Sequence, residues 1–299
     1  MRMALLNESH LGKETVYPEK YDKSVLFRIP RADNRELYGI YADKLPFIGM
    51  DVWNAYEISF LTDNGLPVSR VMKMMYDVKS KYLVESKSLK LYLNSFNMEK
   101  LGKSVAEAEE KIKKIIIADM SELLETEVKI NFFSDVDRKM TAFTDLNDSK
   151  LTDMVPETQL ESITFEHFTE SPELLIGIRT NDIHSYNFRS DLLRSNCPVT
   201  NQPDWGDLFV RMTTPYKIDL TSIIAYLVSF RRENHFHEEV AEMIFKRFMD
   251  AFEPASLMIA AMYTRRGGID INPIRTTHLS MIDPAFSDME KRLGKNLRQ

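Results

Sequence analysis

A short internal repeat constrains the fold of this chain more than any other feature. The segment Tyr92–Phe96 (Tyr-Leu-Asn-Ser-Phe) is matched by Tyr226–Phe230 (Tyr-Leu-Val-Ser-Phe). The surroundings of the two copies agree, because strand-like runs precede each copy, and an amphipathic helix and a further strand-like run follow it. A chain of 299 residues is long enough for two modules of ordinary size. The repeat therefore predicts two halves built on one plan.

The first half contains clear strand and helix signals. Two β-rich runs, Tyr56–Leu61 and Val68–Met75, lie on either side of the turn signal at 63–65. Further along, Ser104 and Glu107 form a capping box, which predicts a helix start. The apolar residues that follow recur on one helical stripe: Val105, Ala108, Ile112, Ile115, Ile116 and Leu123.

The second half repeats these signals in the same order. Leu208–Met212 is the strand-like run ahead of the second copy, and Asn234 is a plausible N-cap. Apolar residues then recur every four positions, at Phe236, Val240, Ile244 and Phe248. The runs Val128–Phe133 and Leu257–Tyr263 follow the two helices. The order β-β-α-α-β-β, twice, predicts an α+β fold in which helices cover one face of antiparallel sheet.

The polar stretch between the halves predicts a linker. We place the first module at 1–135, the linker at 136–161 and the second module at 162–299.

Charge and cysteine content narrow the function classes. A net charge of −6 argues against broad nucleic-acid or anionic-membrane binding, which needs a basic footprint. No apolar run is long enough to cross a bilayer, and the first residues carry only a four-residue apolar stretch. The single cysteine excludes an internal disulfide. We expect a cytoplasmic protein.

The cysteine lies in a loop that favours a chemical role. Pro198 disfavours helix at Cys197, and Pro203–Gly206 is a turn signal. Asp204 comes seven residues after Cys197, so a turned loop brings the two side chains together. The plainer alternative is that Cys197 is a small buried hydrophobic residue and Asp204 only opens a turn. If Asp204 donates a proton, burial beside Trp205 is what would keep it protonated.

Two further segments carry candidate ligand-binding residues. His237 and Glu238 begin the second-half helix, where a carboxylate accepts two hydrogen bonds from a planar donor edge; alternatively, Glu238 only complements the helix dipole. His235, His237 and Cys197 raise the alternative of zinc, although residues two apart on a helix do not share a face. At 265–268, two arginines and two glycines suit phosphate oxygens, or form a surface hairpin turn. No dinucleotide fingerprint or Walker pattern occurs.

Four segments together resemble one family, the NADPH-dependent 7-cyano-7-deazaguanine reductases (the QueF family), in its long two-module form. They are Val84–Lys90 (whose Glu-Ser-Lys-Ser-Leu-Lys run is like the family signature), Cys197–Asp204, Phe236–Glu238 and Arg265–Gly268. Flanking Leu45–Phe47 and Asp270–Pro273 extend the similarity over most of the chain.

The resemblance implies tandem tunnelling-fold (T-fold) modules, a homodimer, and no nucleic acid or membrane as partner. It implies NADPH-dependent reduction of a nitrile to a primary amine in queuosine tRNA modification, through a covalent thioimide on cysteine. The implied catalytic residues are Cys197, Asp204 and His237. The implied base-binding residues are Val84, Glu85, Ser86, His237 and Glu238. Those implied for NADPH are Ser86, Lys87, Arg266 and Gly267, with no metal.

Two rival functions stay open at this point. One is a zinc-dependent purine or pterin hydrolase related to the GTP cyclohydrolases, and it needs a bound metal. The other is a non-catalytic binder of a modified base, which needs neither Cys197 nor NADPH.

Overall fold

One sheet runs through both halves of the chain in the computed structural model, which describes residues 17–134, 140–141, 146 and 148–294. Its strand order is β5-β3-β2-β12-β11-β10-β8-β7. The strands are β2 (Ile48–Leu61), β3 (Pro67–Asp77), β5 (Val128–Phe133), β7 (Ser149–Lys150), β8 (Gly177–Ser190), β10 (Pro203–Ile218), β11 (Ser256–Tyr263) and β12 (Ile269–Thr276). All neighbours in this order pair antiparallel except β7 and β8.

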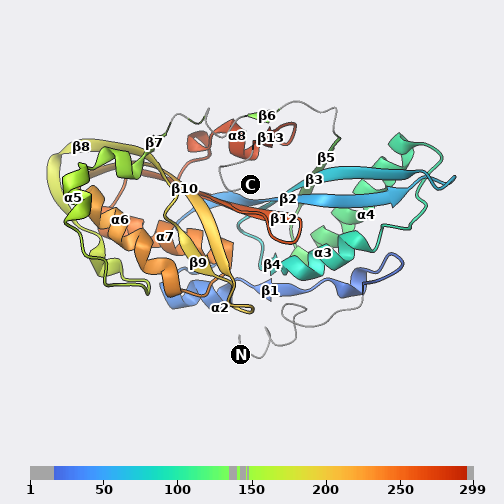
Figure 1. The fold of residues 1–299 in the computed structure, drawn as a ribbon, viewed down its shortest axis with the longest axis horizontal. Coiled ribbons are helices and arrows are strands. Elements are labelled where there is room, and N and C mark those ends of the chain that lie inside the picture. The colour runs from blue at the N-terminus through green and yellow to red at the C-terminus, as the bar shows by residue number, and fades with distance from the viewer. Residues whose placement is uncertain (1–16, 135–139, 142–145, 147, 295–299) are drawn as a thin grey trace.

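Four helices lie on one face of this sheet, α3 and α4 over the first half and α6 and α7 over the second (Figure 1). They are α3 (Ser86–Asn94), α4 (Val105–Leu124), α6 (Leu220–Ser229) and α7 (His237–Phe252). This arrangement confirms the predicted α+β class.

Short elements complete the described part of the chain. The short strands are β1 (Arg28–Pro30), β4 (Tyr82–Val84), β6 (Met140–Thr141), β9 (Arg194–Asn196) and β13 (Arg292–Leu293). The short α-helices are α2 (Ala32–Arg35), α5 (Glu157–Glu161) and α8 (Pro284–Ser287). The 3-10 helices are η1 (Lys23–Val25), η2 (Glu36–Tyr38), η4 (Leu151–Met154), η5 (Pro172–Leu174), η6 (Phe230–Arg232) and η7 (Leu279–Met281).

The two copies of the internal repeat are similar in local geometry as well as in sequence. Tyr92 and Phe96 pack edge-to-face at 5.3 Å and 88°, and Tyr226 and Phe230 do so at 5.4 Å and 88°. The serine of each copy donates a hydrogen bond to the tyrosine carbonyl, at 2.6 Å and 2.7 Å. Each tyrosine hydroxyl also donates to a carboxylate. The two copies therefore share their local geometry, as the prediction of two halves on one plan requires.

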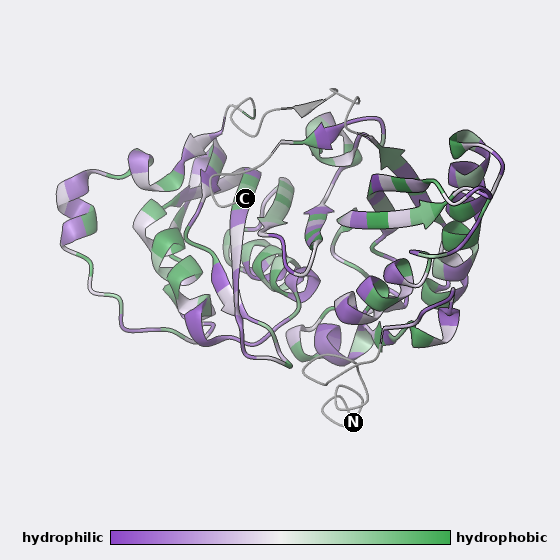
Figure 2. Ribbon diagram, turned by 45° about the vertical axis from the view of Figure 1, so that its right-hand side comes forward, coloured by the Kyte–Doolittle hydropathy of each residue, from purple (hydrophilic) through white to green (hydrophobic). Residues whose placement is uncertain are grey.

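The two long helices follow the predicted stripes. On α4 the buried residues are Ala108, Ile112, Ile116, Met120 and Leu124. Ser104 is the N-cap, as predicted, and accepts from the Glu107 amide at 3.2 Å. Figure 2 shows the resulting division of the helices into hydrophobic and hydrophilic sides.

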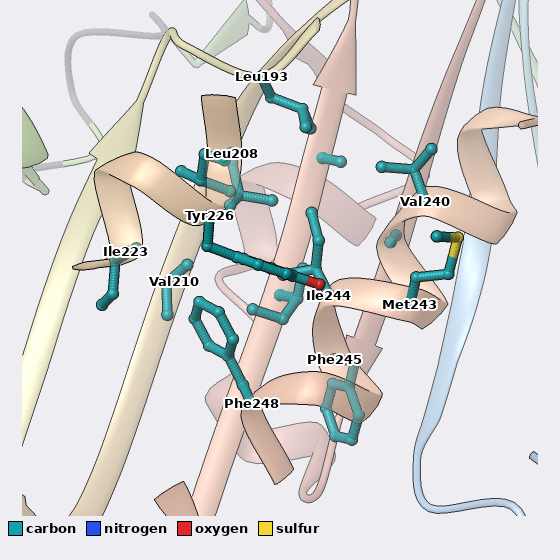
Figure 3. Packing of buried hydrophobic residues seen from close by; sticks show 14 of the residues in the cluster. Leu193, Leu208, Val210, Ile223, Tyr226, Val240, Met243, Ile244, Phe245 and Phe248 are labelled. Carbon is teal, nitrogen blue, oxygen red and sulfur yellow. The ribbon is translucent and has the colours of Figure 1, made fainter. Parts of the chain in front are cut away.

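The largest core cluster packs α6 and α7 against β10 and β11. Val240, Ile244 and Phe248 of α7 are fully buried in it, as their spacing predicts. Tyr226 lies between these side chains and the strands (Figure 3). Burial of one such side chain contributes about 1.5–3 kcal/mol, so this cluster holds the helices in place.

The two halves join through the pair β2–β12, in register from Ala55 opposite Ile269 to Ile48 opposite Thr276. A buried ionic network reinforces this joint. Arg275 of β12 contacts Asp51 of β2 and Glu242 of α7, both at 2.8 Å.

Two arginines of the N-terminal segment complete the network. Arg31 pairs with Asp51 and lies 3.5 Å from Glu242, and Arg35 pairs with Glu242 at 2.7 Å. All five charged groups are buried. Because each charge faces an opposite one, the network keeps these groups ionised away from water.

Several predictions at element ends were wrong. Asn234 is not the N-cap of α7; Phe236 is, and only the Glu239 carboxylate caps there, accepting from the Phe236 amide at 3.0 Å. Residues 203–206 do not turn but begin β10, because residues 203–205 pair with β9 and Gly206 pairs with β11.

The predicted linker and the first-half pattern also differ from the structure. Within 136–161, β7 pairs with β8, and Leu151 is fully buried, so this end of the stretch belongs to the second half; residues 136–139, 142–145 and 147 lie outside the described residues. The predicted order for the first half was β-β-α-α-β-β, but the last of these strands is missing from the long sheet. The strand that follows β5, β6, pairs with β13 in a separate two-stranded sheet. Across the described residues, helices of the length and apolarity that a bilayer crossing requires are absent.

Candidate active site

A cavity of about 260 Å³ lies where elements from both halves meet. The first half contributes the start of α3, and the second contributes the β9–β10 hairpin, the start of α7 and the β11–β12 turn. Its lining is Tyr17, Ser86, Lys87, Lys90, Cys197, Pro198, Thr200, Gln202, Asp204, His235, Phe236, His237, Arg266, Gly267, Ile269 and Ile271. The volume is near the lower end of small-molecule sites.

The β9–β10 hairpin holds Cys197 at the cavity wall. The Cys197 amide donates to the Gln202 carbonyl at 2.8 Å, and the Asn201 amide donates to the Cys197 carbonyl at 3.1 Å. Asn201 adopts a left-handed φ of 54°, which closes the loop. The thiol-bearing residue is half-buried and free. A loop fixed in this way holds a nucleophile in one position, in agreement with the predicted loop.

Asp204, the second residue of β10, is buried and lines the same cavity. Its Oδ1 lies 2.8 Å from Arg266 Nε and 3.3 Å from His237 Nε2. The His237 ring is stacked on Tyr263, with 3.8 Å between centroids and 3° between planes. The structure thus gathers a thiol, a carboxyl and an imidazole around one space.

Glu238 is not among the residues that line this cavity, but it is the second residue of α7 and follows His237, which does line it. The side chain is buried, and its Oε1 has no hydrogen-bond partner among the described residues. Burial, aided by the negative charge of Asp51, raises the pKa of Glu238 from 4.5 to about 8, although Arg31 and Arg275 oppose the shift. An unsatisfied buried acceptor is costly and marks a position where a ligand donor fits.

The signature segment enters the site only in part. Ser86 and Lys87 line the cavity at the start of α3, whereas Val84 belongs to the first-half core. Both carboxylate oxygens of Glu85 cap α3, accepting from the amides of Lys87 and Ser88 at 2.8 Å and 2.7 Å. The role of Val84, Glu85 and Ser86 toward a base stays a prediction.

The Arg-Arg-Gly-Gly turn separates its two guanidinium groups. Arg266 points into the cavity and also donates to Gln202 Oε1 at 3.0 Å, whereas Arg265 stacks over Tyr56 at 3.9 Å. Gly267 and Gly268 have φ of 54° and 77°, which the tight turn requires. Only Arg266 and Gly267 therefore face the cavity.

Some cavity residues were missed by the sequence analysis. Lys90 stands in the signature run, and Thr200 and Gln202 stand in the cysteine loop, so motif membership could have included them. His235 entered only as a zinc candidate. Ile269 and Ile271 gave no signal, because an apolar strand pattern does not distinguish core from cavity wall.

The donor set does not favour the zinc alternative. Across the part of the chain that the structure describes, no three histidine, cysteine or carboxylate side chains are grouped as metal ligands. His235 faces Glu233 at 3.0 Å, and His237 faces Asp204.

Comparison with known proteins gives a consistent result. The family model described as nitrile reductase, 7-cyano-7-deazaguanine-reductase N-term, matches residues 17–132, and one described as QueF-like protein matches residues 203–280. Curated relatives named NADPH-dependent 7-cyano-7-deazaguanine reductase include that of Psychrobacter arcticus, 37% identical over 91% of this chain and 95% of the relative. That of Rickettsia bellii is 39% identical over 91% and 94%, and that of Coxiella burnetii 36% identical over 96% of both chains. The chain therefore belongs to the 7-cyano-7-deazaguanine reductase family.

Proposed function

We propose that this protein reduces the nitrile of 7-cyano-7-deazaguanine to the aminomethyl group of 7-aminomethyl-7-deazaguanine, with NADPH as reductant. The observation that carries the proposal is the placement of Cys197, Asp204 and His237 around one cavity whose other wall is cationic. The names of the relatives support the same reaction.

The residues at the cavity fit a phosphorylated cofactor. Lys87, Lys90 and Arg266 bring three cationic side chains to it, and Gly267 lets backbone approach a ligand closely. We assign NADPH to Ser86, Lys87, Arg266 and Gly267, with Lys90 beside them. Bound NADPH supplies hydride, two equivalents for each nitrile.

Glu238 is the acceptor for the base. A deazaguanine presents adjacent N–H donors on one edge, and a carboxylate accepts both. The unpartnered Oε1 at the start of α7 suits that edge. We assign the nitrile end of the base to the side of the thiol and the carboxyl, because His237, the neighbour of Glu238 in the sequence, lines the cavity with both of them.

The first chemical step adds Cys197, as the thiolate, to the nitrile carbon. The thiolate sulfur forms a bond with the nitrile carbon, and the π-electron pair moves to nitrogen, which takes a proton from Asp204. The product is a covalent thioimide, and Asp204 is left as a carboxylate. Arg266 and His237 face that carboxylate at 2.8 Å and 3.3 Å, so its negative charge forms beside two donors.

The later steps return the thiolate. Once the thioimide carbon has gained a hydride and its nitrogen a proton, the carbon–sulfur bond breaks and Cys197 leaves as the thiolate. The protonated imine that remains needs a second hydride to become the amine. Imines hydrolyse in water, so the apolar wall of Ile269, Ile271 and Phe236 protects it by limiting access of solvent. We further propose that the protein acts on the free base in queuosine tRNA modification, as a cytoplasmic homodimer.

Trapping the adduct tests the proposal. The protein is mixed with 7-cyano-7-deazaguanine without NADPH, and near-UV absorbance and mass are recorded beside Cys197→Ala. A new band and a mass gain equal to the whole substrate, both absent from the variant, are expected. No adduct on the unmodified protein would refute the covalent mechanism.

A further inference from the structure

His235 lines the active-site cavity, yet the reaction described above does not use it. The residue lies two positions before His237 and three before Glu238, immediately ahead of α7. Its surroundings tie the start of α7 to the hairpin that carries Cys197.

Backbone pairing makes the first connection. Residues 233–235 run beside β9: the Asn196 amide donates to the Glu233 carbonyl at 2.8 Å, and the His235 amide donates to the Asn196 carbonyl at 3.1 Å. The Asn234 side chain then donates to the Cys197 carbonyl at 3.1 Å. The position of the sulfur is therefore set relative to this short segment.

The imidazole of His235 makes the second connection. Its Nε2 lies 3.0 Å from Glu233 Oε2, and its Nδ1 lies 3.5 Å from Glu239 Oε2. The same Glu239 oxygen accepts the Phe236 amide at 3.0 Å. One ring thus joins the segment paired with β9 to the first turn of α7, which holds His237 and Glu238.

The ring carries a positive charge in this setting. Although burial alone lowers the pKa of His235, the hydrogen bond with Glu233 and the negative charges of Glu233 and Glu239 raise it to about 9. Tyr38 of η2 faces the ring with its hydroxyl at 3.4 Å, and Glu170 and Arg247 face Tyr38 in turn. Asp204, His237, Lys87 and Arg266 line the same cavity.

We propose that His235 is a positioning residue: as an imidazolium held between Glu233 and Glu239, it fixes His237 and Glu238 at the distance from Cys197 that addition to the nitrile requires. This inference rests on the proposed function and deepens it. The cation is present at neutral pH, and the ring loses its proton as the pH rises through about 9. Above that pH both carboxylates face a neutral ring, and the contribution of the ion pairs is lost.

The test is the rate constant of adduct formation without NADPH, measured from pH 6.5 to 10. His235→Gln keeps a polar side chain of similar length that can form hydrogen bonds, but glutamine cannot become a cation. We expect the variant to form adduct about ten- to a hundredfold more slowly at pH 7, the scale of a small misplacement of reacting groups. The ratio of wild-type to variant rate constants should fall as the pH rises through about 9, by about five- to tenfold between pH 7 and 10, because only about a tenth of the wild-type rings are charged at pH 10.

Controls separate positioning from folding and from failure of the proposed function. His278→Gln, at an exposed histidine away from the cavity, should match the wild type at every pH. Glu239→Gln should lower the rate constant of adduct formation. Adding His235→Gln to that variant should lower the rate constant little further, because the two side chains act through the same ion pair.

Three outcomes are decisive. A wild-type to His235→Gln ratio that falls toward one at alkaline pH, with both proteins folded by circular dichroism, supports the proposal. A ratio near one at pH 7, or one that stays constant with pH, overturns it while the proposed function stands. No adduct on the wild-type protein at any pH overturns the proposed function and this inference with it.

Discussion

Base binding should strengthen as the pH rises, because the carboxyl to which we assign the base is protonated near neutral pH. Glu238 has a pKa of about 8, raised by burial and by Asp51. The donor edge of the base needs the ionised carboxylate. Each base molecule that binds at pH 7 must therefore displace a proton from Glu238. The free energy needed to remove that proton makes binding weaker.

The size of the effect follows from the ionised fraction. With a pKa of about 8, roughly 3% of Glu238 is ionised at pH 6.5 and about 75% at pH 8.5. The association constant should rise about 25-fold between these values, which corresponds to about 1.9 kcal/mol. This window ends below the pH at which His235 loses its charge.

The assay is calorimetric titration of Cys197→Ala with 7-cyano-7-deazaguanine, since this variant cannot form the adduct. Titrations at pH 7 in two buffers of different ionisation enthalpy should show close to one proton released per base. The control is Cys197→Ala with Glu238→Gln, which should bind weakly with no such pH dependence. Equal affinity at pH 6.5 and 8.5, or the same dependence in the control, would show that the reasoning is wrong.

The same ionisation acts on stability in the opposite direction. The folded protein holds the Glu238 proton more tightly than the unfolded chain, whose carboxyl has a pKa near 4.5. This residue's contribution to stability therefore falls as the pH rises from about 4.5 to about 8 and then levels off.

Two further substitutions test the cofactor site and the joint between the halves. Arg266→Ala should raise the Michaelis constant for NADPH about tenfold or more in steady-state assays. The control is Arg265→Ala, which should leave this constant unchanged because the Arg265 guanidinium lies over Tyr56. Equal effects of the two substitutions would remove Arg266 from the cofactor site. Asp51→Asn leaves Glu242 as the carboxylate that three buried arginines share, so it should lower the free energy of unfolding by about 3–5 kcal/mol in urea titrations. The exposed Asp153→Asn should lower it by less than about 0.5 kcal/mol, and a small loss for Asp51→Asn would mean that the network adds little.

Local patterns predicted the elements whose signals are local. The stripe on α4, the four-residue spacing on α7 and the runs that became β5 and β11 depend on periodicity, which the sequence displays directly. Pairings between distant segments leave no such trace. The β2–β12 joint could not be foreseen, and residues 203–206 became strand because β9 lies beside them.

The candidate site was predicted by residue type better than by arrangement. The motifs named several of the residues that line the cavity, including Cys197, Asp204 and His237. They did not indicate that Glu85 caps a helix, that Arg265 turns away, or that His235 joins α7 to the hairpin. Each of these depends on which neighbour is nearest in space, and that information belongs to the tertiary fold.

The joint between β2 and β12 has a consequence for how the chain folds. Asp51 and Arg275 are 224 positions apart in the sequence, yet they meet in the middle of the sheet. Contacts of such high sequence separation form late, after most of the loop-closure entropy has been lost, and slow folding results. Until β12 arrives, β2 has an unpaired edge that can recruit other chains, so the interval before closure is when this protein is most exposed to aggregation.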